Sequence, residues 1–419
     1  MNSLLDKMDI DIKVYDMFQK AETELTNIFS KIDKVAFLNS LKVISAFKEE
    51  NITEGDFTSS SGYGYNDYGR DKIERVFARV FGAEDALVRS QFISGSHALT
   101  VCFFSLLRPN DTLLSISGLP YDTLHEVIGI KDNPSSLKAF GINYDQIDLL
   151  NDDFDYQKIE EYLRNNKVKV IEIQRSKGYS TRKSIAISKI AKVIKLIKSI
   201  DKNIIVMIDN CYCEFVEELS PIEVGADVIV GSLIKNLGGG IAQNGGYIVG
   251  TKEIVHLASE RLNLPGEAKE VGPSLGHNRE ILMGLYHAPY VVASALKTAI
   301  ITSKVLEDLG YQVEPLYNDE RCDIVQNIFF GKKDDLILYT KGIQYGSAID
   351  SNASVIPTPM PGYDDEVIMA SGSFTQGSSI EVSCDGPLRE PYIAYQQGAL
   401  TYDYGKIAVM SAVSKLIHK

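Results

Sequence analysis

The chain has 419 residues, of which 44% are hydrophobic and 24% charged, and its formal net charge is −13 at pH 7. This length suits two domains, one of them large, and the composition is that of a globular chain rather than a disordered one. A chain with this net negative charge is not expected to have the positive surface that binds nucleic acid or an anionic membrane. The charge therefore argues against both as partners.

The N-terminus and the cysteines both favour a reducing compartment. The first twenty residues carry Asp and Lys among their apolar positions and have no cleavage motif, so we expect no signal peptide. No stretch reaches the roughly 18 apolar residues of a membrane span. Five scattered cysteines do not suggest a disulfide framework, which makes the cytoplasm the expected location. Cys211 and Cys213 are separated by one residue and have no partner pair, so we expect no metal site.

Residues 1–55 are expected to form an N-terminal helical arm, because apolar residues recur there at helical spacing. The stretch that overlaps its end, residues 53–69, is rich in Gly, Ser and Tyr and is predicted to be a loop. It presents Tyr63 and Tyr65, and Arg70 follows directly. These side chains either pack in a solvated turn or supply hydrogen-bond donors to an anion from a mobile loop.

Ser94-Gly95-Ser96 opens a predicted helix directly after a short strand. Gly95 has no side chain to block a ligand, and the free N–H groups of a helix start bind phosphate through hydrogen bonds and the helix dipole. The alternative is that Ser94 or Ser96 acts only as a helix N-cap. Further on, Tyr121 follows a strand predicted over 112–117. It either lies flat over a planar ligand ring or caps the core.

Two later apolar runs end in residues that carry chemistry. The run over 202–210 ends with Asp209, and the run over 226–231 is followed by Ser232 and Lys235. Strands alternating with crossover helices through this region predict a doubly wound, mostly parallel α/β sheet. In such a sheet Asp209 and Lys235 emerge at the same carboxyl edge, where ligands bind. An amine that can form a Schiff base and an acid that faces a pyridinium nitrogen are what pyridoxal phosphate (PLP) requires.

The residues around Lys235 argue against a nicotinamide cofactor. The glycines behind it do not form the G-x-G-x-x-G turn of a nicotinamide site, which is therefore not supported. A Schiff-base lysine must be reactive near neutral pH, so we expect burial or nearby positive charge to lower the pKa of Lys235. Once a substrate displaces it, the amine can carry protons at the reacting carbons.

The large domain is predicted over 56–300, and a smaller α+β domain over 301–419. A long apolar helix over about 290–309 is expected to connect them. Within the small domain the sequence predicts short strands followed by one closing helix. The strands are expected over 322–331, 335–346, 366–374 and 379–386, and the helix from about Tyr392.

Nearly the whole chain resembles one enzyme family through motifs spread along its length. The most specific are SGYGYNDYGRD, RSQFISGSHAL, IQRSKGYSTR, GSLIKNLGGGIAQNGGY and GSSIEVSCDGPLREPY. They are similar to those of the methionine γ-lyase-like, or aluminium-resistance, family. These are fold-type-I PLP-dependent enzymes related to the cystathionine γ-synthase and β-lyase group. The resemblance therefore implies the fold-type-I architecture and PLP as the cofactor.

The resemblance also implies roles for individual residues. Lys235 resembles the Schiff-base lysine and Asp209 the acid on the pyridine nitrogen. Tyr121 resembles the ring-stacking tyrosine, which assists as an acid or base. Three further residues resemble those that hold the phosphate in the family: Gly95, Ser96 and Ser232.

In the relatives a tyrosine and an arginine of the neighbouring subunit also touch the phosphate. The counterparts here are Tyr63, Tyr65 and Arg70, although their spacing departs from the Y-x-R-x-x-N-P-T pattern of the relatives. Such sharing implies a homodimer or homotetramer, because each site needs two chains.

The substrate end of the site departs from the pattern of the relatives. Cystathionine-type enzymes bind the substrate carboxylate with a late arginine, but Glu381 stands at the comparable place here. Arg389 and Arg175 are the candidate replacements, each against the alternative of a surface or structural ion pair.

The activity implied by the resemblance is that of a carbon–sulfur lyase. It would act by β- or γ-elimination on a sulfur amino acid such as methionine or cystathionine. The alternatives are another fold-type-I PLP reaction, of the aminotransferase or aldolase type, or a PLP-binding protein with a homeostatic or regulatory role. Lys235 and Asp209 are common to all of these.

Overall fold

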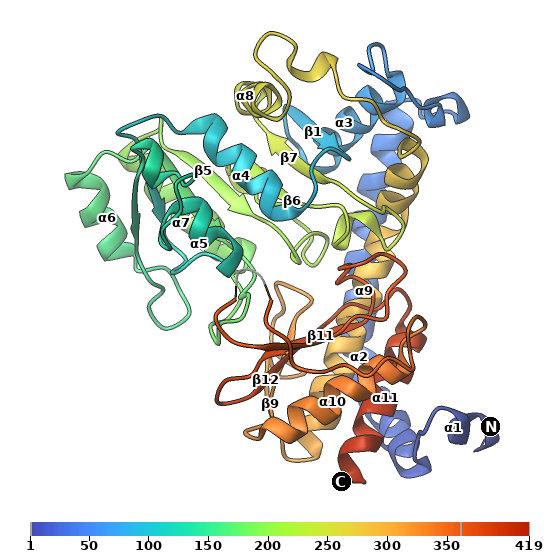
Figure 1. Ribbon diagram of the computed structural model, residues 1–419. Coiled ribbons are helices and arrows are strands. Elements are labelled where there is room, and N and C mark those ends of the chain that lie inside the picture. Colours follow the sequence, from blue (N-terminus) through green and yellow to red (C-terminus); the bar gives the residue numbers. More distant parts are fainter. Residues whose placement is uncertain (1, 361–362, 419) are drawn as a thin grey trace.

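The computed structural model describes residues 2–360 and 363–418, and these form an α/β protein with two sheets in two domains (Figure 1). The large sheet has seven strands and is mostly parallel, and the small sheet has five antiparallel strands. Figure 1 shows the small domain beneath the large one, with two long helices running along both. This is the architecture expected of the fold-type-I group.

The large sheet has the strand order β1-β7-β6-β5-β4-β2-β3. The strands from β6 to β3 are parallel, whereas β7 runs antiparallel to β6 and β1. Most of these strands are buried along their length because helices cover both faces, which explains their nearly continuous apolar runs. The strands are β1 (Asp85–Arg89), β2 (Thr112–Ser115), β3 (Asn143–Gln146), β4 (Val170–Gln174), β5 (Ile205–Asp209), β6 (Val228–Ser232) and β7 (Gly246–Gly250).

Alternate residues of these strands enter two separate apolar cores. One core includes α4 (Gly95–Leu106) and α8 (Lys252–Leu262), and the other includes α3 (Tyr68–Phe81), α6 (Tyr156–Asn165) and α7 (Ile187–Ile200). The carboxyl ends of the parallel strands meet at one edge, where Gln174 of β4 is paired with Asp209 of β5. Short helical turns complete the domain: η1 (Glu54–Phe57), η2 (Asp122–Leu124), α5 (His125–Ile128), η3 (Lys138–Phe140), η4 (Ile222–Val224), η5 (Asn236–Gly238) and η6 (Ala268–Glu270).

Two long helices connect the domains. The expected helical arm consists of the short α1 (Asn2–Lys7) and the continuous α2 (Ile12–Glu49), which lies beside α9 (Asn278–Asp308). Both α2 and α9 contribute apolar residues to the cores of both domains, so the domain boundary expected at 300/301 falls inside α9. Among the described residues no helix combines the length and the apolar character needed to cross a membrane.

The small sheet has the order β10-β11-β12-β9-β8, and α10 (Lys333–Gly346) and α11 (Tyr402–Ile417) pack on it. Figure 1 shows these two helices close together on the side of the sheet away from the large domain. The strands are β8 (Gln312–Glu314), β9 (Gln326–Phe329), β10 (Val367–Ala370), β11 (Ser383–Pro387) and β12 (Ile393–Gln397).

Two sequence predictions for this domain are wrong. Residues 335–346 form most of helix α10 instead of a strand, because Leu336, Tyr339 and Ile343 recur at helical spacing and pack into the core. The closing helix does not begin at Tyr392. The segment after it forms the buried strand β12, and α11 begins ten residues later, where the Thr401 side chain caps its first turn.

Candidate active site

Lys235 lies in the turn after β6 and directly precedes the short helix η5. Its Nζ atom is 4.0 Å from the centre of the Tyr212 ring, which follows β5. Burial alone would lower the pKa of Lys235, but four acidic groups raise it above its ordinary value. In order of effect they are Cys211, Tyr212, Asp209 and Glu214. The expectation of a lowered pKa is therefore not met, because the neighbours of this lysine are acidic rather than basic.

Asp209 ends β5 and is buried at the carboxyl edge of the sheet. One of its carboxylate oxygens accepts a hydrogen bond of 3.1 Å from the backbone N–H of Cys211. Burial raises the pKa of Asp209, and the positive charge of Lys235 offsets part of this rise. The two side chains emerge at adjoining strand ends and interact electrostatically, so the structure brings this pair together.

The start of α4 approaches the end of β6 closely. Gly95 is the first residue of the helix, and a Cβ atom there would lie 3.3 Å from both Cys211 Sγ and Ser232 Cβ. Ser94 is the N-cap, since its Oγ accepts a hydrogen bond of 3.0 Å from His97 N–H. Ser232 is buried on the other side of this contact. Backbone N–H groups of the first helical turn, which have no partner within the helix, therefore begin next to Ser232.

Tyr121 lies where the two domains meet. Its hydroxyl oxygen is 2.5 Å from that of Tyr363, and its ring centroid is 6.2 Å from that of Tyr179. Burial raises the pKa of Tyr121 well above its ordinary value, so the hydroxyl keeps its proton at neutral pH. Ser96 Oγ is 2.7 Å from Thr123 Oγ1, and this contact ties the start of α4 to the Tyr121 segment.

Tyr63 and Tyr65 are on the surface of their own subunit. Both rings are exposed, by 70% and 53%, and they stack with their centroids 5.7 Å apart. Exposed aromatic rings on a loop are suited to contact with another molecule, since their apolar area is not used within the chain.

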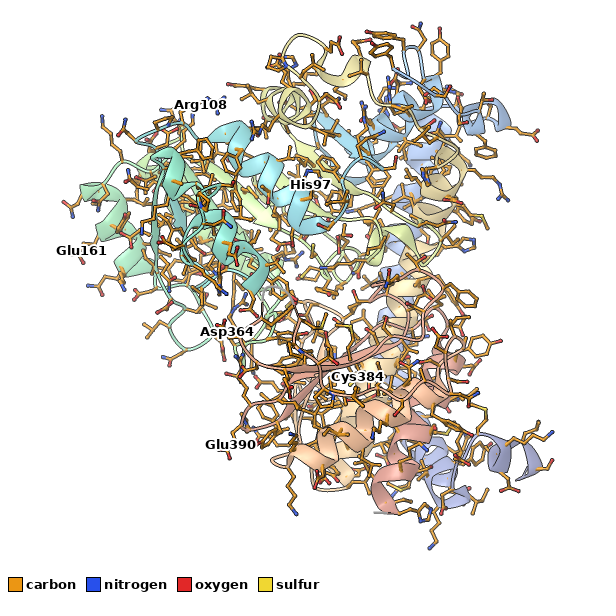
Figure 2. The ribbon with its side chains drawn as sticks, in the orientation of Figure 1. His97, Arg108, Glu161, Asp364, Cys384 and Glu390 are labelled. Atoms are coloured by element: carbon orange, nitrogen blue, oxygen red, sulfur yellow. The ribbon has the colours of Figure 1, made fainter. Side chains whose placement is uncertain are left out.

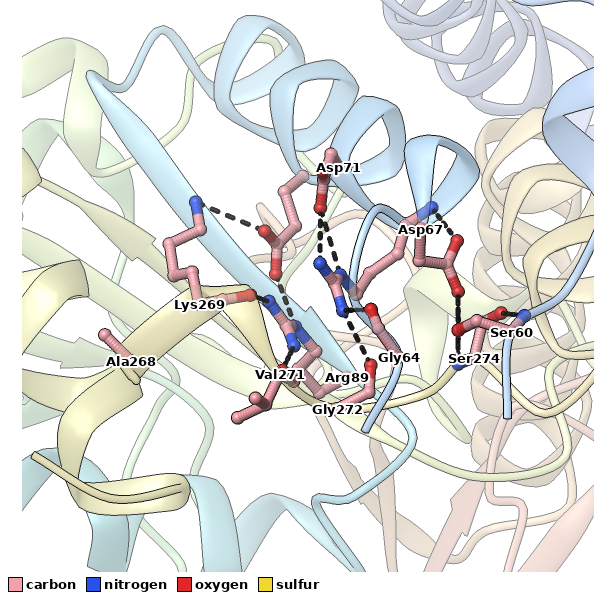
Figure 3. A network of polar contacts seen from close by, with 12 residues as sticks. Ser60, Gly64, Asp67, Asp71, Arg89, Ala268, Lys269, Val271, Gly272 and Ser274 are labelled. Carbon is pink, nitrogen blue, oxygen red and sulfur yellow. Dashed lines mark hydrogen bonds and ion pairs between the residues drawn. The ribbon is translucent and has the colours of Figure 1, made fainter. Parts of the chain in front are cut away.

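Arg70 is buried, and three residues that it contacts, Gly64, Asp71 and Gly272, are labelled in Figure 3. Its guanidinium donates hydrogen bonds to the carbonyl oxygens of Gly64 at 2.8 Å and Gly272 at 2.9 Å. It donates two more, at 2.9 and 3.0 Å, to one carboxylate oxygen of Asp71. Four of its five N–H donors are therefore engaged within the same chain. We infer that Arg70 holds the loop of Tyr63 and Tyr65 in shape.

The two candidates for binding the substrate carboxylate have different environments. Arg175 is buried, and it donates to Asn210 Oδ1 at 2.7 Å and to Glu217 Oε2 at 2.5 Å. These bonds occupy the guanidinium, which indicates a structural role. Arg389 is instead half exposed and pairs with Asp365 at 3.1 Å.

Arg389 also lines a cavity of about 350 Å³ at the domain boundary, together with Asp122, Tyr179 and Tyr363. Asp364, labelled in Figure 2 between the two domains, lines the same cavity. Arg389 is therefore within reach of a ligand that enters beside Tyr121. Glu381, at the place of the arginine of the relatives, accepts the Phe374 and Thr375 N–H groups at 2.8 and 3.1 Å, so it stabilises a loop.

Sequence reasoning missed two acidic residues near Lys235. Asp385, in β11, accepts a hydrogen bond of 2.6 Å from the Tyr179 hydroxyl and interacts electrostatically with Lys235. Glu214, which interacts electrostatically with Lys235, is likewise buried, and burial raises its pKa to about 7. The signal was present for Asp385, because it lies within the distinctive motif GSSIEVSCDGPLREPY.

Comparison with known proteins shows the family to which the chain belongs. The model of the methionine γ-lyase family matches residues 14–417. The uncharacterized protein YnbB of Bacillus subtilis (strain 168) is 45% identical over 403 residues, which cover 96% of each chain. A crystal structure named as a carbon–sulfur lyase involved in aluminium resistance, from Clostridium novyi NT, superposes with a TM-score of 0.95 at 47% identity, covering 99% of this chain and 98% of the other.

A more distant structure shows the fold alone. The PLP-dependent protein YhfS from Escherichia coli superposes with a TM-score of 0.61 at 16% identity, covering 91% of this chain and 96% of that one. The family match extends from α2 to the last helix and so includes both sheets and the Lys235 turn. On this match, the chain belongs to the methionine γ-lyase family.

Proposed function

We propose that this chain is a PLP-dependent carbon–sulfur lyase that eliminates a thiol from a sulfur amino acid such as methionine or cystathionine. The observation that carries the proposal is the meeting of Lys235, Asp209 and the start of α4 at one edge of the large sheet. Family membership implies PLP, and the name of the Clostridium novyi relative supports the reaction class.

The residues at this edge fit the cofactor. The close approach of Gly95 to Ser232 leaves no room for a side chain, but it offers N–H groups and the positive end of a helix dipole to a phosphate. A negative charge at Asp209 favours a protonated pyridinium nitrogen, because opposite charges stabilise each other's ionised forms. Lys235 supplies the amine that would hold the cofactor covalently.

When bound, PLP supplies an electron sink next to the reacting carbon of the substrate. Lys235 would take a proton from that carbon and return one later. Tyr121, which burial keeps protonated, would donate its proton to the leaving sulfur. Arg389 would exchange its ion pair with Asp365 for the substrate carboxylate, because it lines the cavity beside Tyr121 and Arg175 does not.

Replacing Lys235 tests the central claim. Purified protein is expected to show the visible absorbance of lysine-bound PLP, and Lys235→Ala is expected to lose it. Lys183→Ala is the matched control, since that lysine side chain is half exposed and lies outside the site. Persistence of the absorbance in Lys235→Ala would sink the proposal.

Product analysis separates the reaction classes. The lyase releases a thiol, ammonia and an oxo acid from methionine or cystathionine. Formation of a second amino acid from an added oxo acid would identify aminotransfer, and release of an aldehyde from a β-hydroxy amino acid would identify aldol cleavage. A full cofactor spectrum without turnover of any amino acid would instead favour a homeostatic role.

We also propose that a second copy of the chain completes each site with the loop of Tyr63 and Tyr65. The exposed, stacked rings and the rigid support from Arg70 favour this arrangement. Mixing inactive Lys235→Ala with a Tyr63→Ala, Tyr65→Ala double variant should restore part of the activity if sites are shared. A monomer by light scattering, or no restoration, contradicts the sharing.

A further inference from the structure

Asp385 has an unusual position for a carboxyl group. It lies in the middle of the small sheet, where β11 is paired with β10 and β12, and it is buried. Its Oδ2 atom accepts the hydrogen bond from the Tyr179 hydroxyl. Its Oδ1 atom is also buried but has no hydrogen-bond partner among residues 2–360 and 363–418. A buried carboxylate oxygen without a donor carries a large desolvation cost, so a donor or cation from outside the chain would be bound strongly there.

Among the described residues, one cation shifts the pKa of Asp385. That cation is Lys235, whose charge lowers the pKa of Asp385. Tyr179 also lowers it through its hydrogen bond, but burial outweighs both and raises the pKa to about 6. The remaining titratable groups that interact with Asp385 are neutral at this pH: Tyr121, Tyr212, Tyr363, Cys384 and Tyr395.

The surroundings also define what this oxygen can recognise. The ring of Tyr179 contacts those of Tyr363 and Tyr395, with centroids 5.6 and 4.9 Å away, so the walls beside Asp385 are aromatic. Aromatic faces and one carboxylate suit a cationic ligand, through charge and cation–π attraction. Tyr179 and Tyr363 also line the cavity of about 350 Å³ at the domain boundary.

We propose that Asp385 binds the ammonium group of the incoming amino acid and removes one proton from it. The proposal deepens the lyase function given above and rests on it. In this step an N–H bond of the ammonium breaks, an O–H bond forms at Oδ1, and the electron pair stays on nitrogen. The free amine is then the form of the substrate that PLP chemistry would require. The carboxyl group returns its proton to solvent when the product leaves.

The separate roles of Lys235 and Asp385 follow from their positions in the two domains. Lys235 comes from the large domain, and its amine would be engaged in holding the cofactor when the substrate arrives, so another group must accept the first proton. Asp385 comes from the small domain and changes charge near neutral pH, so it can accept a proton and release it again.

Asp385→Asn is the decisive variant, because its amide oxygen can still accept the Tyr179 hydrogen bond. The variant should keep the PLP absorbance but lose kcat/KM by about a hundredfold at pH 7. The variant can use only substrate whose amine is already deprotonated. Its kcat/KM should therefore rise about tenfold per pH unit up to the pKa of the substrate amine. A structural role would lower activity without this slope.

Tyr179→Phe tests the same role through the pH at which Asp385 loses its proton. It removes a hydrogen bond that stabilises the charged form of Asp385, so the acid limb of the kcat/KM profile should move to higher pH. In cofactor-free protein, the infrared band of the protonated Asp385 carboxyl should titrate near pH 6. The band should be missing in Asp385→Asn. In Tyr179→Phe it should titrate at a higher pH. This measurement does not depend on activity.

The outcomes separate the two proposals. If wild-type protein binds no PLP or releases no thiol, the lyase function fails, whatever Asp385 does. If wild-type protein is an active lyase but Asp385→Asn keeps its pH profile, or Tyr179→Phe leaves the acid limb in place, the role of Asp385 is refuted. Absence of the infrared band near pH 6 in the wild type also refutes it.

Discussion

Asp67 stabilises the loop that carries Tyr63 and Tyr65, and its contribution should depend on pH. The carboxylate is buried and accepts hydrogen bonds from Ser60, Ser274 N–H, Arg70 N–H and Asn278. Burial alone would raise the pKa of Asp67, but these donors lower it from 3.8 to about 2. Since each pH unit corresponds to about 1.4 kcal/mol, ionised Asp67 contributes about 2 kcal/mol at neutral pH.

Asp67→Asn removes this charge while keeping an acceptor at the helix N-cap. We expect the free energy of unfolding to fall by about 2 kcal/mol at pH 7. Because the native pKa lies below the unfolded one, the contribution of Asp67 is complete above pH 3.8 and disappears as the pH falls toward 2. The difference between wild type and variant should therefore shrink by roughly half between pH 7 and pH 3.

Urea unfolding followed by circular dichroism at several pH values measures this difference. Asp71→Asn is the control, since Asp71 also binds Arg70 but its side chain is 40% exposed, and its loss should cost less than about 1 kcal/mol. Equal destabilisation at pH 7 and pH 3 would refute the reasoning, because it would mean that the charge of Asp67 contributes nothing.

Two further predictions concern the candidate site. Gly95→Ala should weaken PLP binding by about tenfold or more, because its Cβ would press on Cys211 and Ser232 at 3.3 Å. Equilibrium dialysis measures the affinity for PLP, and an unchanged affinity would contradict the phosphate site. Arg389→Ala should raise KM with little change in stability. Arg175→Ala should instead destabilise the fold by about 3 kcal/mol, because it removes a buried guanidinium and leaves the partly buried Glu217 carboxylate without its cation. Steady-state kinetics and urea unfolding distinguish the two, and an unchanged KM in Arg389→Ala would exclude it as the carboxylate ligand.

The large domain was predictable because its strands are apolar runs that end in chemically distinctive residues. Asp209 and Lys235 follow two such runs, and the parallel order of the sheet brings them to one edge. Residues 335–346 were mispredicted because Ile337, Tyr339 and Ile343 have strand propensity, while the packing of the helix in the core outweighs it.

The substrate side of the site was less predictable, because it depends on contacts between distant segments. Arg175 and Arg70 were reasonable anion ligands by residue type, but only the folded chain shows that each is occupied by local acceptors. The motif GSSIEVSCDGPLREPY marks the segment of Asp385, but its role could not be assigned because its partner Tyr179 is 206 positions away in sequence. The sequence of a strand does not show which oxygen of a carboxylate has no hydrogen-bond donor in the folded chain.

The site therefore depends on how the two domains are held together. Lys235 belongs to the large domain and Asp385 to the small one, and the helix pair α2 and α9 enters both cores. Ion pairs join these helices, from Lys297 to Asp33 at 2.6 Å and from Lys304 to Glu24 at 3.2 Å. Because long helices resist bending, this pair fixes the distance between the amine and the carboxyl group. The cofactor chemistry proposed for Lys235 and the substrate deprotonation proposed for Asp385 therefore depend on the same pair of helices.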